Sequence, residues 1–213
     1  MTKWTRMKRP VAAVLLCGAV VTGLQGCVEM AVGTAVMGTL AATDRRTFGA
    51  QTEDKAILFK GETRVANLVG DAGHVNVTSF NRKVLLTGEV RDQAMKAAVE
   101  REVAAIEGVQ SIVNDLEVAG VSSFTSRSND SLITGKVKAS FVDAKDLYAN
   151  SIKVVTERGV VYLLGRVTQR EGQLAADVAR NVGGVQKVVK VFEYISEQEF
   201  KQLTAAPEDQ NKK

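Results

Sequence analysis

The feature that most constrains the fold of this chain is an internal repeat. A segment that begins at Val75 recurs in the same register at Ile152, and each copy reaches a central glycine, Gly88 or Gly165. The apolar positions that match are Val75, Val77, Val84, Leu86 and Val90 in the first copy, and Ile152, Val154, Val161, Leu163 and Val167 in the second. Each copy should therefore build the same small unit, and the chain should contain two of them.

Both copies predict the element order α-β-β-α-β. Apolar residues alternate at a period of two on either side of a short polar turn, which is typical of a β-hairpin. Thr168 and Glu171 form a capping-box pattern that marks the start of a helix. The expected helices are 53–69 and 92–107 in the first copy and 130–144 and 169–182 in the second; the expected strands are 75–77, 84–87 and 112–118, then 152–154, 160–164 and 188–195. The fold class is α+β, with helices on one face of a small mixed sheet, and copies this small are expected to pack together.

The segment before Cys27 (1–26) has the composition of a secretory signal peptide. A basic head (Lys3, Arg6, Lys8, Arg9) precedes an apolar run from Val11 to Leu24, which is shorter than the ~20 residues of a spanning helix. The sequence then divides into a tether (27–51), a first domain (52–119), a second domain (129–195) and a flexible polar tail (196–213).

At the expected cleavage point, Leu24-Gln25-Gly26-Cys27 resembles the bacterial lipobox. This resemblance implies that Cys27 carries fatty acyl chains such as palmitate, and that these chains anchor the mature protein without a membrane span. Val28, where an Asp would retain the protein in the inner membrane, implies delivery to the outer membrane. Cys17 leaves with the signal, so no free thiol is expected for a disulfide, a metal or a nucleophile.

Cleavage also removes the apparent basicity. The whole chain has 28 Lys and Arg against 24 Asp and Glu. All four basic residues of the head lie before Cys27, and no acidic residue does, so the mature chain is close to neutral. The composition therefore gives no support to nucleic-acid binding.

The two copies resemble the BON domain. The motifs are Val84-Leu-Leu-Thr-Gly88 with Gly108-Val109-Gln-Ser-Ile112, and Val161-Tyr-Leu-Leu-Gly165 with Gly184-Val185-Gln-Lys-Val188. Two such domains behind a lipobox are similar to the dual-BON outer-membrane lipoproteins, and residues 42–51 resemble their lead-in. The resemblance implies a non-enzymatic protein on the periplasmic face of the outer membrane. It also implies binding of anionic phospholipid through the second domain, a role in envelope integrity, and enrichment at sites that include the division site.

Charge and helix pattern favour the second domain as the one that binds lipid. Residues 53–119 carry 8 basic and 11 acidic residues, whereas residues 130–195 carry 10 and 7. In the helix expected at 130–144, Ile133, Val137, Ser140, Phe141 and Ala144 form the core stripe. The opposite face, which we interpret as the candidate lipid site, holds Leu132, Gly135, Lys136, Lys138, Ala139 and Val142. It lacks an aromatic residue where Leu132 stands, so two alternatives stay open: lipid contact is weaker here, or it is supplied by Phe124 in the linker or Tyr148 just past the helix.

Two alternatives stay open at this point. One is a scaffold that binds an envelope-assembly machine or a peptidoglycan-linked partner; the other is a soluble osmotic-stress protein like the single-BON periplasmic proteins. His74 is the one histidine, expected in a turn before a strand, so neither a catalytic triad nor a histidine-based metal site is predicted. We expect no cofactor and no enzymatic activity.

Overall fold

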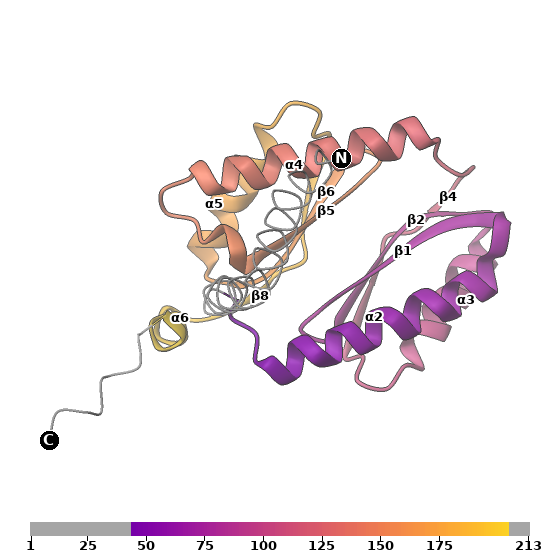
Figure 1. The fold of residues 1–213 in the computed structure, drawn as a ribbon, viewed down its shortest axis with the longest axis horizontal. Helices are drawn as coiled ribbons and strands as arrows, with labels where there is room; N and C mark the ends of the chain where they lie inside the picture. Colours follow the sequence, from indigo (N-terminus) through magenta and orange to yellow (C-terminus); the bar gives the residue numbers. More distant parts are fainter. Residues whose placement is uncertain (1–43, 205–213) are drawn as a thin grey trace, which may run out of the picture. The chain divides into compact units, whose positions relative to one another are not determined.

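The computed structural model describes residues 44–204, and residues 45–204 belong to one compact unit. Two repeats of the same order follow each other along this unit (Figure 1). The predicted signal peptide, Cys27 and most of the tether lie outside the described residues, as do residues 205–213.

The two repeats contain the same elements in the same order. The first comprises α2 (Phe48–Val69), η1 (Gly70–Ala72), β1 (Gly73–Phe80), β2 (Lys83–Val90), α3 (Gln93–Ala104), β3 (Ser111–Asn114) and β4 (Glu117–Val118). The second comprises α4 (Phe124–Asp143), η2 (Ala149–Ser151), β5 (Ile152–Glu157), β6 (Val160–Val167), α5 (Gln169–Arg180), β7 (Lys187–Lys190) and β8 (Glu193–Tyr194), and is followed by α6 (Glu197–Thr204).

Each repeat contains a mixed sheet. In the first, β1 pairs with β2 antiparallel, and β2 pairs with β3 and β4 in parallel. The second repeats this arrangement with β5, β6, β7 and β8. The predicted α+β class and the helix and strand order are confirmed.

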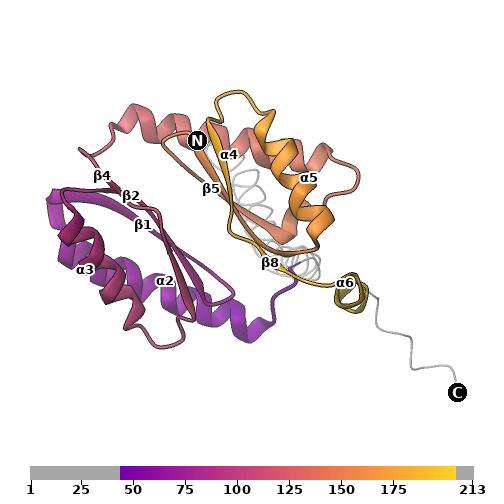
Figure 2. The same ribbon diagram turned by 180° about the vertical axis from the view of Figure 1, so that it is seen from behind.

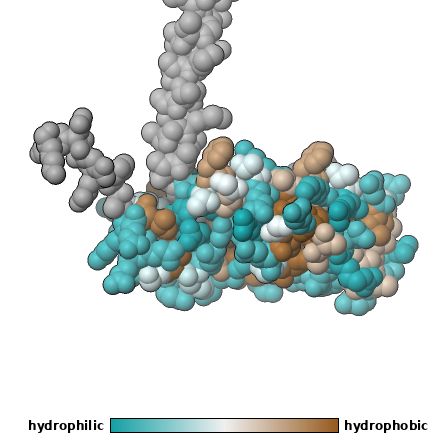
Figure 3. Space-filling model, turned by 90° about the horizontal axis from the view of Figure 1, so that it is seen from below, coloured by the Kyte–Doolittle hydropathy of each residue, from teal (hydrophilic) through white to brown (hydrophobic). Residues whose placement is uncertain are grey.

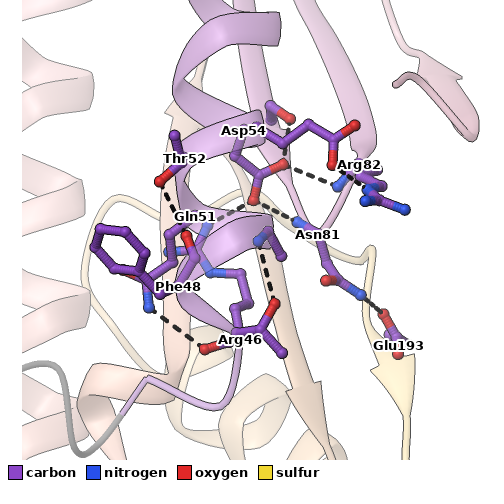
Figure 4. A network of polar contacts seen from close by, with 12 residues as sticks. Arg46, Phe48, Gln51, Thr52, Asp54, Asn81, Arg82 and Glu193 are labelled. Atoms are coloured by element: carbon purple, nitrogen blue, oxygen red, sulfur yellow. Dashed lines mark hydrogen bonds and ion pairs between the residues drawn. The ribbon is translucent and has the colours of Figure 1, made fainter. Parts of the chain in front are cut away.

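The hairpin turns are tied to the first helix of each repeat by a buried aspartate. Both central residues of each turn have positive φ, as a type I′ turn requires. Their backbone N–H groups donate to the carboxylate of Asp54 in the first repeat and of Asp130 in the second, at 2.7 to 2.8 Å. The donors are Asn81 and Arg82 for Asp54, and Arg158 and Gly159 for Asp130. Figure 4 shows Asp54 reaching from α2 to the turn. Gly159 of the second turn has a φ of +75°, a conformation that glycine adopts easily.

The helices cover one face of each sheet, and the opposite faces meet. Separate apolar cores lie between helices and sheet in the two repeats. A third core is formed by sheet residues of both repeats, among them Phe80, Leu85, Tyr162 and Leu164. The helices therefore lie outside and the sheets inside, as Figures 1 and 2 show. The expectation that the two copies pack together is confirmed.

Several element boundaries differ from those predicted. Helices α2 and α4 begin at Phe48 and Phe124, five and six residues earlier than expected, because their first turns carry small and polar residues without an apolar period. Residues 197–204, which we expected to belong to a flexible tail, form α6. The last strand of each repeat is divided into two short segments, and His74 lies within β1 rather than in a turn.

Candidate functional site

The candidate site is the outer face of α4, the first helix of the second repeat. The side chain of Ser123 caps the helix by accepting a hydrogen bond from the N–H of Ser126 at 3.2 Å. Ile133, Val137 and Phe141 are buried against the sheet, as predicted, and this stripe fixes which side of α4 faces solvent.

All six residues predicted for the lipid site are exposed on the side away from this stripe. Leu132 is 64% exposed and Val142 is 73% exposed. Gly135 and Ala139 lie between them and add no bulk to the face. The structure therefore brings the six predicted residues together on one open surface: Leu132, Gly135, Lys136, Lys138, Ala139 and Val142.

Its two lysines are not neutralised by neighbouring carboxylates. Within residues 44–204, neither Lys136 nor Lys138 takes part in an ion pair. Asp130 is turned inward to the hairpin turn. On the adjacent strand, burial lowers the pKa of Lys153; the positive charges of Arg46 and Lys138 act in the same direction, and the negative charges of Asp54 and Glu62 oppose them.

An aromatic residue does stand at the start of this helix. Phe124 is the first residue of α4 and is 78% exposed. Five full helical turns separate Phe124 from Val142, so the two side chains share the outer face. Tyr148, the other aromatic considered, instead packs edge-on against Phe200, with ring centroids 5.7 Å apart. Phe124 is thus the aromatic residue available to the candidate site.

Sequence reasoning missed the contact that joins the lead-in to the second repeat. Arg45 forms a buried two-bond pair with Glu171, at 2.7 and 2.8 Å, and its guanidinium also donates to the carbonyl of Arg166. The guanidinium lies over the rings of Tyr148 and Phe200. The sequence pointed to this contact only through the capping box, which the structure confirms. Its Glu171 accepts hydrogen bonds both from the N–H of Thr168 and from Arg45.

The described residues contain no candidate metal centre. Across residues 44–204 there is no group of three or more His, Cys, Asp or Glu side chains placed to hold a metal ion. Burial lowers the pKa of His74, and the positive charge of Arg127 acts in the same direction. No helix in this part of the chain is long and apolar enough to cross a bilayer.

The fold and the repeated motifs define a class of protein. The profile of the BON domain matches residues 61–120 and 129–196, so the chain belongs to the BON domain family. The resemblance inferred from the sequence is confirmed.

Known proteins with similar sequences place the chain more narrowly within the BON domain family. The chain is 40% identical over 184 residues to the outer membrane lipoprotein DolP of Haemophilus influenzae, a match that covers 85% of this chain and 94% of the relative. It is 35% identical over 158 residues to a 21 kDa hemolysin of Actinobacillus pleuropneumoniae, covering 71% and 79%. It is 28% identical over 191 residues to the osmotically-inducible protein Y of Escherichia coli, covering 86% and 95%. The chain is a dual-BON lipoprotein of the DolP type, anchored by lipid in the outer membrane.

Proposed function

We propose that this lipoprotein binds anionic phospholipid through α4 of its second BON domain, and that it supports envelope integrity by this binding rather than by catalysis. The lipid on Cys27 holds the chain at the membrane, and α4 selects lipid patches rich in negative charge, including those at the division site. A tethered domain can use a weak headgroup site because tethering raises its effective concentration.

The observation that carries this proposal is the composition of the exposed α4 face. Phe124, Leu132 and Val142 supply apolar and aromatic surface, and the two lysines beside them have no ion-pair partner among the described residues. Apolar side chains flanked by lysine are typical of helices that lie in the headgroup region. Each lysine near an anionic surface contributes about 1 kcal/mol.

Co-sedimentation with vesicles tests the α4 contact. The unacylated chain from Val28 onward should bind vesicles containing phosphatidylglycerol several-fold better than vesicles of phosphatidylcholine alone. The double variant Lys136→Glu/Lys138→Glu should bind the phosphatidylglycerol vesicles about tenfold less well. The matched control is Lys187→Glu/Lys190→Glu, which makes the same charge change on exposed residues of β7. Equal binding to both vesicle types, or equal effects of both double variants, would refute the proposal.

Acylation is tested separately. Mass spectrometry of the N-terminal peptide should find Cys27 as the first residue of the mature chain, carrying acyl chains, and Cys27→Ser should release the protein from membranes. A soluble, unmodified mature chain would instead favour the osmotic-stress hypothesis.

Photocrosslinking in cells separates lipid binding from a scaffold role. A crosslinker at position 132 should give adducts with lipid. A discrete protein adduct there would favour the envelope-assembly scaffold. Cells that carry only the Lys136→Glu/Lys138→Glu variant should show the same detergent sensitivity as cells that lack the protein.

A further inference from the structure

The first repeat also exposes aromatic side chains on its first helix. Phe48 is 85% exposed and Phe59 is 73% exposed. Their separation is close to three helical turns, so both project from the same side of α2, about 16 Å apart along its axis. In Figure 4 the ring of Phe48 points away from the polar network at the hairpin turn. We name the surface formed by Phe48, Thr52, Lys55, Phe59, Lys60 and Thr63 the α2 face.

The threonines make this face more apolar than its sequence suggests. The hydroxyl of Thr52 donates to the carbonyl of Phe48 at 3.0 Å, and the hydroxyl of Thr63 donates to the carbonyl of Phe59 at 2.9 Å. Because these hydroxyls bond back to their own helix, they do not need water or a partner's polar groups. Figure 3, which views the unit from the side of α2 in Figure 1, shows hydrophobic patches within a hydrophilic surface.

Most of the acidic charge of the helix lies away from this face. Glu53 and Asp54 face the hairpin, where they pair with Arg82 and with the turn N–H groups. Lys55 and Lys60 are exposed on either side of Phe59, and Glu62 is exposed beside Lys55, so this side of α2 carries two positive charges and one negative charge. An aromatic side chain flanked by two exposed lysines matches the boundary between acyl chains and anionic headgroups.

The position of the lipid anchor identifies a bilayer as the surface that this face meets. The described chain enters α2 directly after residues 44–47, and Cys27 lies a short distance upstream in the sequence. Even when fully extended, the chain between Cys27 and Phe48 spans at most ~75 Å. The acyl chains therefore keep the α2 face at high local concentration beside the same membrane.

We propose that the α2 face is a second membrane-contact site, in which Phe48 and Phe59 insert at the headgroup level while Lys55 and Lys60 meet lipid phosphates. When the two hairpin aspartates are aligned, Phe59 corresponds to Gly135 of α4. The first repeat thus carries an aromatic anchor at the centre of the face where the second has none.

The two faces cannot meet one flat bilayer together. Helices α2 and α4 lie on opposite outer sides of the unit, as Figures 1 and 2 show. A flat membrane therefore contacts one face at a time, and the anchored protein has two alternative orientations on it.

A second copy of the chain fits this face less well. A symmetric contact between two α2 faces would bring the lysines of one copy near those of the other. Such like-charge contacts cost free energy that a single helix face has little apolar area to offset. An anionic bilayer has the complementary charge.

The test is a depth measurement on the full acylated chain in vesicles. Without Cys17 and with Cys27 blocked by lipid, the mature chain has no competing thiol, so Phe59→Cys can be labelled alone with an environment-sensitive dye. In vesicles containing phosphatidylglycerol, the emission should shift to the blue, and headgroup spin-labelled lipid should quench it. The control is Arg64→Cys, an exposed position on the same helix about 140° around the axis from Phe59, which should be quenched at least threefold less.

Three results would overturn the proposal: equal quenching at positions 59 and 64, a blue shift that grows with protein density and is insensitive to the quencher, or a blue-shifted dye before vesicles are added. The second indicates a second copy, and the third indicates that the tether covers the face.

A binding measurement on the unacylated chain gives an independent readout. In the Lys136→Glu/Lys138→Glu background, which leaves α2 as the main contact, Phe48→Ser/Phe59→Ser should lower the remaining vesicle binding about tenfold, whereas Val118→Ser/Val121→Ser, at exposed positions elsewhere, should change it little. Equal effects of the two double variants would contradict the proposal. The quenching measurement is made with Lys136 and Lys138 unchanged, so a negative result there leaves the α4 proposal standing. The α4 proposal is tested by the effect of Lys136→Glu/Lys138→Glu alone, so its failure leaves the α2 proposal standing.

Discussion

At the scale of single residues, the two hairpin aspartates have a structural role that their sequence context does not reveal. Asp54 accepts from Ser79, from two turn N–H groups and from Arg46. Burial by itself would raise the pKa of Asp54, but these hydrogen bonds together hold it below its usual value. A carboxylate whose pKa is lower in the folded state stabilises the fold above its unfolded pKa.

We therefore predict that Asp54→Asn lowers the free energy of unfolding by about 1–3 kcal/mol at pH 7, because the amide presents N–H donors to backbone N–H donors. The stabilisation is complete above the ordinary pKa of 3.8 and is lost as the pH falls through the lowered folded value. Urea unfolding at pH 7 and near pH 3 should show the difference between wild type and variant shrinking. Asp71→Asn, at an exposed site in η1, is the control and should have little effect at either pH. A constant difference across this range would contradict the prediction.

A second residue-scale prediction concerns Gly88 in β2. Its φ is +111°, and a Cβ at this position would lie 2.0 Å from the carbonyl oxygen of His74 on the paired strand. Gly88→Ala should destabilise the first repeat by about 3 kcal/mol or more, since both the backbone angle and the close approach forbid a side chain. Gly120→Ala, where nothing lies within 4 Å, should be nearly neutral in the same thermal unfolding experiment. Comparable losses for both would show that the close strand contact is not the cause.

At the scale of elements, periodicity was enough to predict the centres of the helices and strands but not the helix starts. The stripe of Ile133, Val137 and Phe141 is visible in the sequence because it recurs once per helical turn. The first turns of α2 and α4 carry Thr, Ser and Gly, which have no such period, and they are held by caps.

Contacts between distant parts of the chain were the part that the sequence could not predict. The hairpin role of Asp54 and Asp130 was hidden because it depends on a turn that lies more than two dozen positions further along the chain. The composition of the α4 face could be predicted, since it follows from one helical period. The bond between Arg45 and Glu171 could not, because the two residues lie 126 positions apart in the sequence.

Helix caps give the element-scale prediction. The Thr168 cap of α5 is buried and reciprocal, because Glu171 bonds back to the N–H of Thr168 at 2.9 Å. The Ser123 cap of α4 is exposed and one-sided. Thr168→Ala should therefore cost about 1–2 kcal/mol, and Ser123→Ala about 0.5–1 kcal/mol. Denaturant titration of the two single variants measures both, and a larger loss from Ser123→Ala would be the contrary result.

At the scale of the whole unit, the two repeats and the lead-in are held together by polar contacts around the shared core. Tyr162 donates to Asp115 at 2.8 Å, and Asn76 donates to Glu157 at 2.6 Å, each bond crossing between repeats. Burial and the bond to Asp115 raise the pKa of Tyr162, so this donor stays protonated at neutral pH. The chain that arrives from the membrane anchor is fastened to the second repeat through Arg45 before it enters the first, which fixes where the tether leaves the folded unit.

The pair of Arg45 and Glu171 is the strongest test of this arrangement. Removing one member of a buried ion pair leaves an uncompensated charge, so Arg45→Met should lower the free energy of unfolding by about 3–5 kcal/mol. Arg45→Met/Glu171→Gln should recover part of that loss, since no charge is then left unpaired and the amide oxygen of the glutamine can still accept from the N–H of Thr168. Arg91→Met, which breaks an exposed pair with Asp92, is the control and should cost less than about 1 kcal/mol. Urea unfolding of the acylation-free chain at low and high salt measures all three, and the Arg45→Met loss should change little with salt because the pair is shielded from solvent ions. If Arg45→Met were no more costly than Arg91→Met, the lead-in would contribute nothing to the fold, and the tether would leave from α2 alone.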